Sequence, residues 1–252
     1  MSLAYNTNLK NKLTSQCKNC SLSSLCLPLV LKDEDINCLD QIIERKKPLK
    51  KGDFLFHQGD PFESIYAVRT GTLKVFNMTD SGEEQITTFY YPGELLGLSG
   101  INTKVYPISA KAIETTTVCE IPFYRLEELS NKIPTLKNQL FKIMSRQICD
   151  GQQMIVLLGK KNADEKVASL LMNIGLRFKR RGYSGTSFRL SMSRNEISNY
   201  LGLAIETVSR VMTRFQKKGL IKANGKEISI TNLEEIQKLA GVITEYDNTS
   251  NT

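Results

Sequence analysis

Between Pro48 and Phe123 the sequence consists of short runs of strand-forming residues that are separated by glycines. The runs include DFLFHQG, SIYAVRTG, TLKVFNMT, EQITTFYYPG and SAKAIETTTVCEIPF. β-Branched and aromatic side chains favour strands, and glycine supplies the positive backbone angles of tight turns. Short strands at this spacing predict a small antiparallel roll or barrel. The 252 residues are sufficient for this roll and a second domain.

A long helix is predicted after the roll, from Pro134 to about Leu158, with Gly159 as its end. Proline suits the first turn of a helix, and about 25 residues would span about 37 Å. Apolar residues recur at a mean spacing of 3.5, which is typical of a two-stranded coiled coil. The predicted dimer seam, in which Gly151 also falls, comprises Phe141, Met144, Ile148, Ile155 and Leu158. A helix packed on its own domain would show the same pattern.

Two shorter helices are predicted on either side of these elements. Asp33 to Arg45 has the apolar spacing of a short amphipathic helix. Asn162 and Glu165 match a capping box, which predicts a helix that runs to about Arg181 and stops at Gly182.

Residues 193–221, SRNEISNYLGLAIETVSRVMTRFQKKGLI, have the apolar register of a helix-turn-helix, with Gly202 at the turn. The second helix, about Ile205 to Lys217, would present a face suited to the major groove. An arginine can donate two hydrogen bonds to the edge of guanine, a carboxylate can accept one from the cytosine amino group, and a hydroxyl can donate or accept. The candidate DNA-binding residues are Glu206, Ser209, Arg210 and Arg214. LIKANGKEISI follows, and its Asn224-Gly225 predicts a β-hairpin wing. An ordinary helical hairpin is the alternative.

Three thiols lie within ten residues, at Cys17, Cys20 and Cys26. A fourth ligand would come from Cys38, Cys119 or Cys149. Cys38 and Cys149 fall on predicted helices, where a free cysteine most often serves as a small buried hydrophobe. Four thiolates suit zinc or an iron–sulfur cluster, and uncomplexed or redox-switching thiols have the same spacing.

The charge is distributed unevenly along the chain. Residues 1–158 carry 18 basic and 17 acidic side chains, whereas residues 159–252 carry 16 and 9. A basic half joined to a neutral one suggests a module that meets a polyanion such as double-stranded DNA, although a solvated basic face looks the same. One histidine, His57, leaves little scope for a His-based triad, so an ordinary hydrolase is not expected. The chain contains no apolar run near the ~18 residues of a membrane span and no secretory signal, and we expect a cytoplasmic protein.

Several longer motifs resemble the CRP/FNR superfamily of bacterial transcription regulators, and within it the oxygen-sensing FNR-type branch. They are CKNCSLSSLCLP, IIERKKPLKKGD, GEEQITTF, VCEIPF, KKNADEK and NYLGLAIETVSR, and the resemblance runs from Cys17 to Gly241. It implies an α+β chain with a cyclic-nucleotide-binding-like antiparallel β-roll, a long dimerisation helix and a winged helix-turn-helix domain. The expected segments are a cysteine-rich cluster-binding segment (1–30), the roll (31–132), the dimerisation helix (133–159) and the DNA-binding domain (160–247).

The resemblance also implies a function, namely an oxygen-responsive global regulator of anaerobic metabolism that acts as a homodimer and is not an enzyme. Its ligands for an oxygen-labile [4Fe–4S] cluster would be Cys17, Cys20, Cys26 and Cys119. Glu206, Ser209 and Arg210 match base-reading residues, which implies inverted repeats resembling TTGAT, a four-base spacer and ATCAA. The surface for RNA polymerase would be Asp80, Ser81, Gly82, Glu83 and Glu84. Oxygen would be the signal, and an exposed cluster would be expected to react with nitric oxide.

Two departures from the family pattern limit what can be carried over. Relatives that bind cyclic AMP place an Arg-Ser pair where this chain has Pro107-Ile108-Ser109, so no cyclic nucleotide is expected. An acidic residue common at the dimer seam is replaced by Gly151, with Asp150 beside it. The rival functions are a zinc- or thiol-switch regulator with the same DNA module and an iron–sulfur electron carrier.

Overall fold

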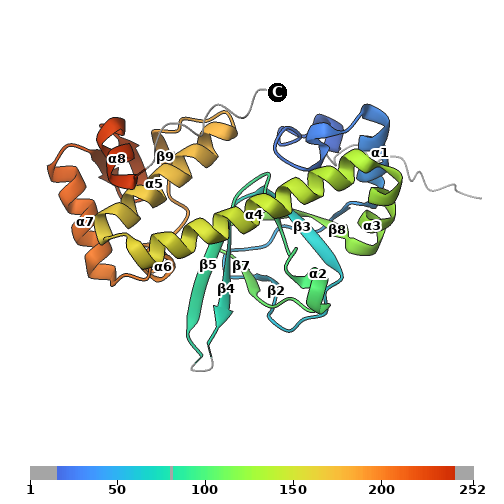
Figure 1. Ribbon diagram of the computed structural model, residues 1–252, viewed down its shortest axis with the longest axis horizontal. Helices are drawn as coiled ribbons and strands as arrows, with labels where there is room; N and C mark the ends of the chain where they lie inside the picture. The colour runs from blue at the N-terminus through green and yellow to red at the C-terminus, as the bar shows by residue number, and fades with distance from the viewer. Residues whose placement is uncertain (1–15, 80–81, 242–252) are drawn as a thin grey trace, which may run out of the picture. The chain divides into compact units, whose positions relative to one another are not determined.

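The computed structural model describes residues 16–79 and 82–241 (Figure 1). The described residues form two compact units, one within 1–73 and 90–145 and the other within 74–89 and 146–252. Each unit contains helices and antiparallel strand pairs, so the expected α+β class is confirmed. In the described part of the chain, no helix is long and apolar enough to cross a membrane.

The first unit contains an antiparallel sheet with the strand order β1-β8-β3-β6. Its strands are β1 (Glu44–Arg45), β8 (Thr117–Pro122), β3 (Ser64–Thr70) and β6 (Leu95–Leu96). β2 (Phe54–Phe56) pairs separately with β7 (Ser109–Ala112). The sequence pattern does not predict β1 and β6, because two residues are too few to show an alternation and only pairing with β8 and β3 defines them.

Short helices precede, follow and interrupt these strands in the sequence. They are η2 (Cys17–Asn19), η3 (Leu27–Val30), α1 (Asp33–Ile42), α2 (Gly100–Thr103) and α3 (Phe123–Lys132). The prediction that α1 extends to Arg45 is wrong, because Glu44 and Arg45 pair with Glu120 and Cys119 of β8 instead. Gly93, with φ of +91°, allows a close approach: a Cβ there would lie 2.9 Å from the Cβ of Leu25, in the cysteine segment.

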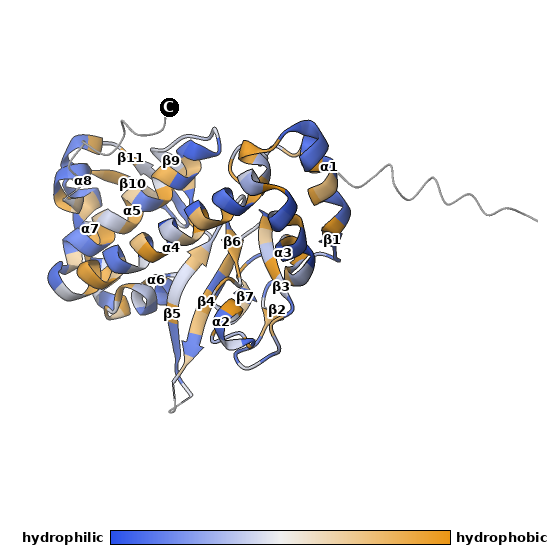
Figure 2. Ribbon diagram, turned by 45° about the vertical axis from the view of Figure 1, so that its right-hand side comes forward, coloured by the Kyte–Doolittle hydropathy of each residue, from blue (hydrophilic) through white to orange (hydrophobic). Residues whose placement is uncertain are grey.

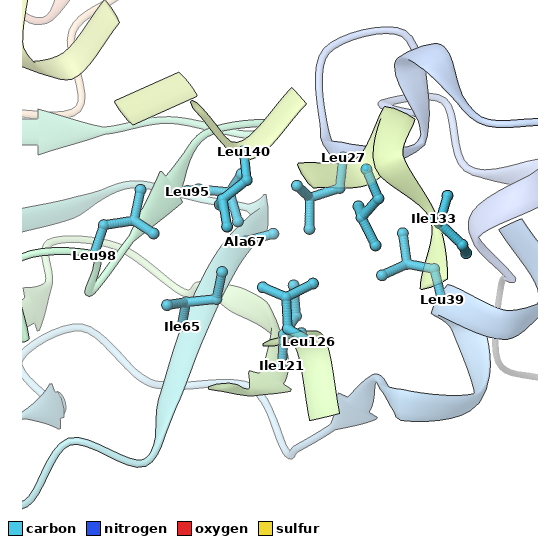
Figure 3. Packing of buried hydrophobic residues seen from close by; sticks show 11 residues of the cluster. Leu27, Leu39, Ile65, Ala67, Leu95, Leu98, Ile121, Leu126, Ile133 and Leu140 are labelled. Carbon is cyan, nitrogen blue, oxygen red and sulfur yellow. The ribbon is translucent and has the colours of Figure 1, made fainter. Parts of the chain in front are cut away.

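One hydrophobic cluster joins the cysteine segment, the sheet and the first turns of α4 (Pro134–Lys160). Leu27 is fully buried in it, together with Leu136 and Leu140 of α4. Figure 3 shows Leu27 and Leu140 among the buried side chains from β3, β8 and α3. Burial of these aliphatic groups is the dominant stabilising term for such a cluster. The core of the first unit therefore includes the residue that follows Cys26.

The long helix α4 is confirmed, and it begins at the expected Pro134. It passes through Gly159 and ends at Lys160, because a helical glycine without a positive φ weakens a helix without stopping it. Hydrophobic and hydrophilic residues intermingle along its ribbon (Figure 2). Only Leu136, Gln139 and Leu140 of α4 are buried, all near its start. Most of the length of α4 therefore has no residue that is fully buried within the protomer.

The second unit holds the C-terminal helices and all but the end residues Leu73 and Tyr90 of the paired strands β4 (Leu73–Met78) and β5 (Glu84–Tyr90). Its other elements are α5 (Ala163–Arg180), β9 (Ser187–Arg189), α6 (Arg194–Leu201), α7 (Ile205–Lys217), β10 (Ile221–Asn224), β11 (Glu227–Ile230) and α8 (Leu233–Ala240). The wing sheet has the order β10-β11-β9. Asn224 pairs with Glu227, so the turn centres on Gly225 and Lys226, one residue later than predicted. Only Gly225 has a positive φ there, which a glycine adopts without strain.

Candidate DNA interface and cysteine site

Three of the four candidate thiols lie at the ends of short helical turns. Cys17 opens η2, Cys20 closes it by donating its backbone N–H to the Cys17 carbonyl at 3.2 Å, and Cys26 is the N-cap of η3. Cys119 lies on β8, opposite Arg45 of β1 on one side and Ala67 of β3 on the other. The site thus combines a loop-like segment with a central strand.

The structure brings these four thiols close enough to influence one another. Burial raises the pKa of Cys26 to about 12, and Cys119 and Cys20 add to the rise. Burial also raises the pKa of Cys17 far above its ordinary value, and Asp40, Cys119 and Cys26 add to the rise. The pKa of Cys119 rises for the same reason, although Arg45 and Arg69 act against the rise. A buried thiolate that lacks compensating charge is costly, so Cys17, Cys26 and Cys119 are thiols at neutral pH.

The remaining cysteines do not join this group. Cys38 and Cys149 are exposed, so the prediction that they are small buried hydrophobes is wrong. Both lie on solvent-facing positions of α1 and α4 rather than on the buried faces. Among residues 16–79 and 82–241, no three His, Cys, Asp or Glu side chains are gathered as a metal-ion site.

Asp40 and Arg45 form a polar support beside the thiols. The backbone N–H of Cys17 donates to Asp40 Oδ1 at 3.0 Å, and Arg45 Nη2 contacts the same oxygen at 2.5 Å. Burial acts to raise the pKa of Asp40, but the hydrogen bonds from Cys17 and Arg45 outweigh it and lower the pKa. The arginine therefore places a positive charge next to the segment that carries Cys17.

The helix-turn-helix is formed as predicted. A Ser193–Glu196 capping box starts α6, and Gly202, at φ +59°, closes it. α7 spans the expected Ile205–Lys217 and buries one face, made of Val208, Val211, Met212 and Phe215. All four candidate DNA-binding residues are exposed on the rest of the helix surface.

The exposed side of α7 carries a basic groove. This open groove of about 640 Å³ is lined by Ser209, Arg210, Thr213, Arg214, Lys217 and Lys218. Ser209 donates its hydroxyl to the Ile205 carbonyl at 2.9 Å, so its lone pairs remain to accept a hydrogen bond. Arg214 is paired with Asp164 at the start of α5, with Arg214 Nε 3.0 Å from Asp164 Oδ2. Four cations along one groove suit a polyanion.

The KKNADEK motif fixes the start of α5 to two other helices. Asn162 and Glu165 form the predicted capping box. Lys161 Nζ donates to the Ala240 carbonyl at the end of α8 at 2.6 Å, and Lys166 Nζ donates to the Leu201 carbonyl at the end of α6 at 3.2 Å. Cationic side chains commonly bind the free carbonyls of helix ends. Apart from the capping box, sequence reasoning missed these contacts, because their partners lie far along the chain.

Comparison with known proteins agrees with this arrangement. Two family models match, the cyclic nucleotide-binding domain over residues 46–132 and the Crp-like helix-turn-helix domain over residues 165–239. The transcriptional activator protein anr of Pseudomonas aeruginosa is 61% identical over 227 residues, which cover 90% of this chain and 93% of that protein. The chain belongs to the FNR-type regulators of the CRP/FNR family.

Other relatives support the same assignment for this FNR-type regulator. The fumarate and nitrate reduction regulatory protein of Escherichia coli is 48% identical over 225 residues, with 89% of this chain and 90% of that protein covered. The structure of FixK2 from Bradyrhizobium japonicum matches with a TM-score of 0.70 at 26% identity, covering 79% of this chain and 97% of that one. The expected β-roll and winged helix-turn-helix fold is thus confirmed, and the chain is a DNA-binding transcription regulator, not an enzyme.

The predicted seam of this FNR-type regulator is largely exposed in the protomer. The exposed fractions are 55% for Phe141, 61% for Ile148, 72% for Ile155 and 39% for Leu158. Met144 differs, because it is partly buried against the core of the first unit. A Cβ at Gly151 would meet no atom within 4 Å, so the protomer itself does not require a glycine there.

Three further sequence features have a structural setting. Asp80 and Ser81 of the predicted polymerase surface lie outside the described residues, whereas Gly82 and Glu83 are exposed and Glu84 pairs with Lys74. Ser109 Oγ accepts the Gln58 backbone N–H at 2.9 Å. His57 stacks on Phe54 with ring centroids 4.1 Å apart.

Proposed function

We propose that this chain is an oxygen-responsive global regulator of anaerobic metabolism, and that Cys17, Cys20, Cys26 and Cys119 hold an oxygen-labile [4Fe–4S] cluster. The relatives named for anaerobic regulation and for fumarate and nitrate reduction support the proposal. The observation that carries it is that Cys26 and Cys119, which come from two separate parts of the chain, pack against the same hydrophobic cluster, while Cys17 and Cys20 lie within ten residues of Cys26.

The residues present fit such a group. Thiolates are the usual ligands of iron–sulfur clusters, and Arg45 and Arg69 supply positive charge near Cys119 to balance thiolates. When bound, the cluster supplies a redox-active centre whose loss in oxygen removes the link between the cysteine segment and β8. Loading deprotonates the thiols, and because the pKa values of Cys17, Cys26 and Cys119 are raised, a higher pH favours the acquisition of iron.

Leu27 connects the cysteine segment to the dimer helix. It directly follows Cys26, is fully buried, and shares its core with Leu136 and Leu140 of α4. An ordered cysteine segment therefore stabilises the base of α4 through apolar packing. A loosened segment removes part of that packing and so destabilises the first turns of α4, the helix that carries the exposed seam.

We propose that two chains pair through Phe141, Met144, Ile148, Ile155 and Leu158 to form a homodimer. Two α7 helices then read inverted repeats resembling TTGAT, a four-base spacer and ATCAA, through Glu206, Ser209 and Arg210. Half-sites about one DNA turn apart match the two-fold symmetry of a dimer. Because both half-sites bind together, a modest loss of dimerisation gives a large loss of operator occupancy.

The remaining parts of the proposal concern partners and location. Gly82, Glu83 and Glu84, with Asp80 and Ser81, are proposed to contact RNA polymerase. Nitric oxide is proposed as a second molecule that reacts at the cysteine site, no cyclic nucleotide is required, and the regulator works in the cytoplasm.

The test is anaerobic purification followed by iron, sulfide and absorbance measurements before and after air. About four irons and four sulfides per chain, with a visible band that decays in air together with operator binding, are expected. Cys119→Ser should lose the iron, whereas the matched Cys38→Ser should keep it. A colourless protein that holds one zinc and is unchanged by air would contradict the proposal. So would a protein whose mass in solution and operator binding are the same before and after exposure to air. Iron without operator binding would instead indicate an electron carrier.

A further inference from the structure

Asp164 is an acidic residue at the edge of the DNA-binding surface. Its carboxylate binds Arg214, which lies four residues from Arg210 and eight from Glu206 on α7. Residues four apart share one helix face, so Arg214 extends the face that carries the base-reading candidates. Arg214 also lines the basic groove with Lys217 and Lys218.

The geometry of the pair leaves part of the guanidinium unused. Asp164 accepts from Nε and from Nη2 of Arg214, so Nη1 with its two N–H groups stays outside the pair. The Arg214 side chain is 45% exposed and the Asp164 side chain 26%. The guanidinium is thus held along one edge while another edge can still reach a phosphate oxygen.

The carboxylate is the fixed partner of the two. Asp164 lies inside the Asn162–Glu165 capping box, between the two lysines that bind the ends of α8 and α6. Arg214, by contrast, extends from α7 on a long side chain with several rotatable bonds. Ordering such a side chain costs free energy on binding, and a preformed contact removes part of that cost.

We propose that Asp164 is a positioning residue, which holds Arg214 ready for a DNA phosphate and so strengthens DNA binding although it is itself acidic. The inference rests on the proposed operator binding. It has an unusual sign, because removing a negative charge beside DNA should by electrostatics alone strengthen binding. Loss of positioning acts in the opposite direction.

The experiment measures the affinity of the anaerobic full-length protein for an operator duplex and for a scrambled duplex across salt concentrations. Asp164→Asn should weaken binding about threefold to tenfold on both duplexes, since a phosphate contact carries no sequence information. Arg214→Ala should weaken both and lower the salt slope by about 0.9 per half-site. Adding Asp164→Asn to Arg214→Ala should not weaken binding further, and the loss of the negative charge alone should strengthen it slightly.

Two controls separate positioning from charge and from folding. Glu234 is the second residue of α8, as Asp164 is of α5, so Glu234→Gln removes a negative charge from the matching position of another helix and should not weaken binding. Asp164→Glu keeps the carboxylate, so its affinity for DNA should lie within about twofold of that of the unchanged protein. The unfolding temperatures of the Asn and Glu variants should not differ in the way that their affinities do. Asp164→Asn that binds as well as the unchanged protein, or that still weakens binding without Arg214, overturns the inference. A wild-type protein that does not prefer the operator contradicts the proposed function instead, and the comparison on the scrambled duplex still decides the role of Asp164.

Discussion

Ile155 provides the sharpest test of the proposed dimer helix, because it is 72% exposed in the protomer. Ile155→Ala removes about three methylene equivalents, or about 2.4 kcal/mol of transfer free energy when the side chain passes from full exposure to full burial. Scaled by the exposed fraction, pairing would recover about 1.7 kcal/mol per chain. Two chains contribute about 3.5 kcal/mol, which weakens the dimer about 300-fold.

Sedimentation equilibrium of the anaerobic protein measures this dissociation constant directly. The free energy of unfolding of the protomer should change by less than about 0.5 kcal/mol, because the lost side chain has little contact within it. Val156→Ala is the matched control, since Val156 is 57% exposed but lies outside the 3.5-residue seam. The reasoning is refuted if both substitutions weaken the dimer equally, or if Ile155→Ala leaves it unchanged.

Three further outcomes test the cysteine segment and the DNA face. In the cluster-free reduced protein, alkylation of Cys26 below pH 9 should be about 1,000-fold slower than that of an ordinary thiol, since a pKa of about 12 leaves that much less thiolate. The alkylation rate should rise with pH up to that pKa. Labelling of Cys26 as fast as that of the exposed Cys38 would contradict this prediction. Leu27→Ala should cost about 2–5 kcal/mol in urea unfolding, whereas Leu29→Ala, at 53% exposure, should cost little. Arg210→Ala should relax discrimination at one base by about 1–3 kcal/mol, and equal weakening on every duplex would instead indicate a phosphate contact.

The parts of the fold that the sequence predicts well are those decided by local chemistry. The bounds of α7 and the Asn162–Glu165 capping box depend on neighbouring residues alone. The strands β1, β6 and β9 are short, and only a partner strand defines them. The same pairing ends α1 early, because pairing with β8 outweighs the favourable helix propensity of Glu44 and Arg45.

The candidate site shows the same division. The spacing of Cys17, Cys20 and Cys26 is visible in the sequence, but the raised thiol pKa values follow from burial that only the fold provides. Nor can a sequence show that Asp164 pairs with Arg214, since 50 residues separate them. The exposure of Cys38 escaped prediction because the residue faces away from the buried positions of α1.

The division of the proposed ligands between η2, η3 and β8 has a consequence for synthesis of the chain. Three thiols leave the ribosome within the first 26 residues, but Cys119 follows almost a hundred residues later. Cys119 also reaches its place only when β8 has joined β1 and β3. The proposed site can therefore be completed only on a chain whose first sheet has already formed. An unfinished or misfolded copy would then lack the proposed cluster and would be kept from regulating genes.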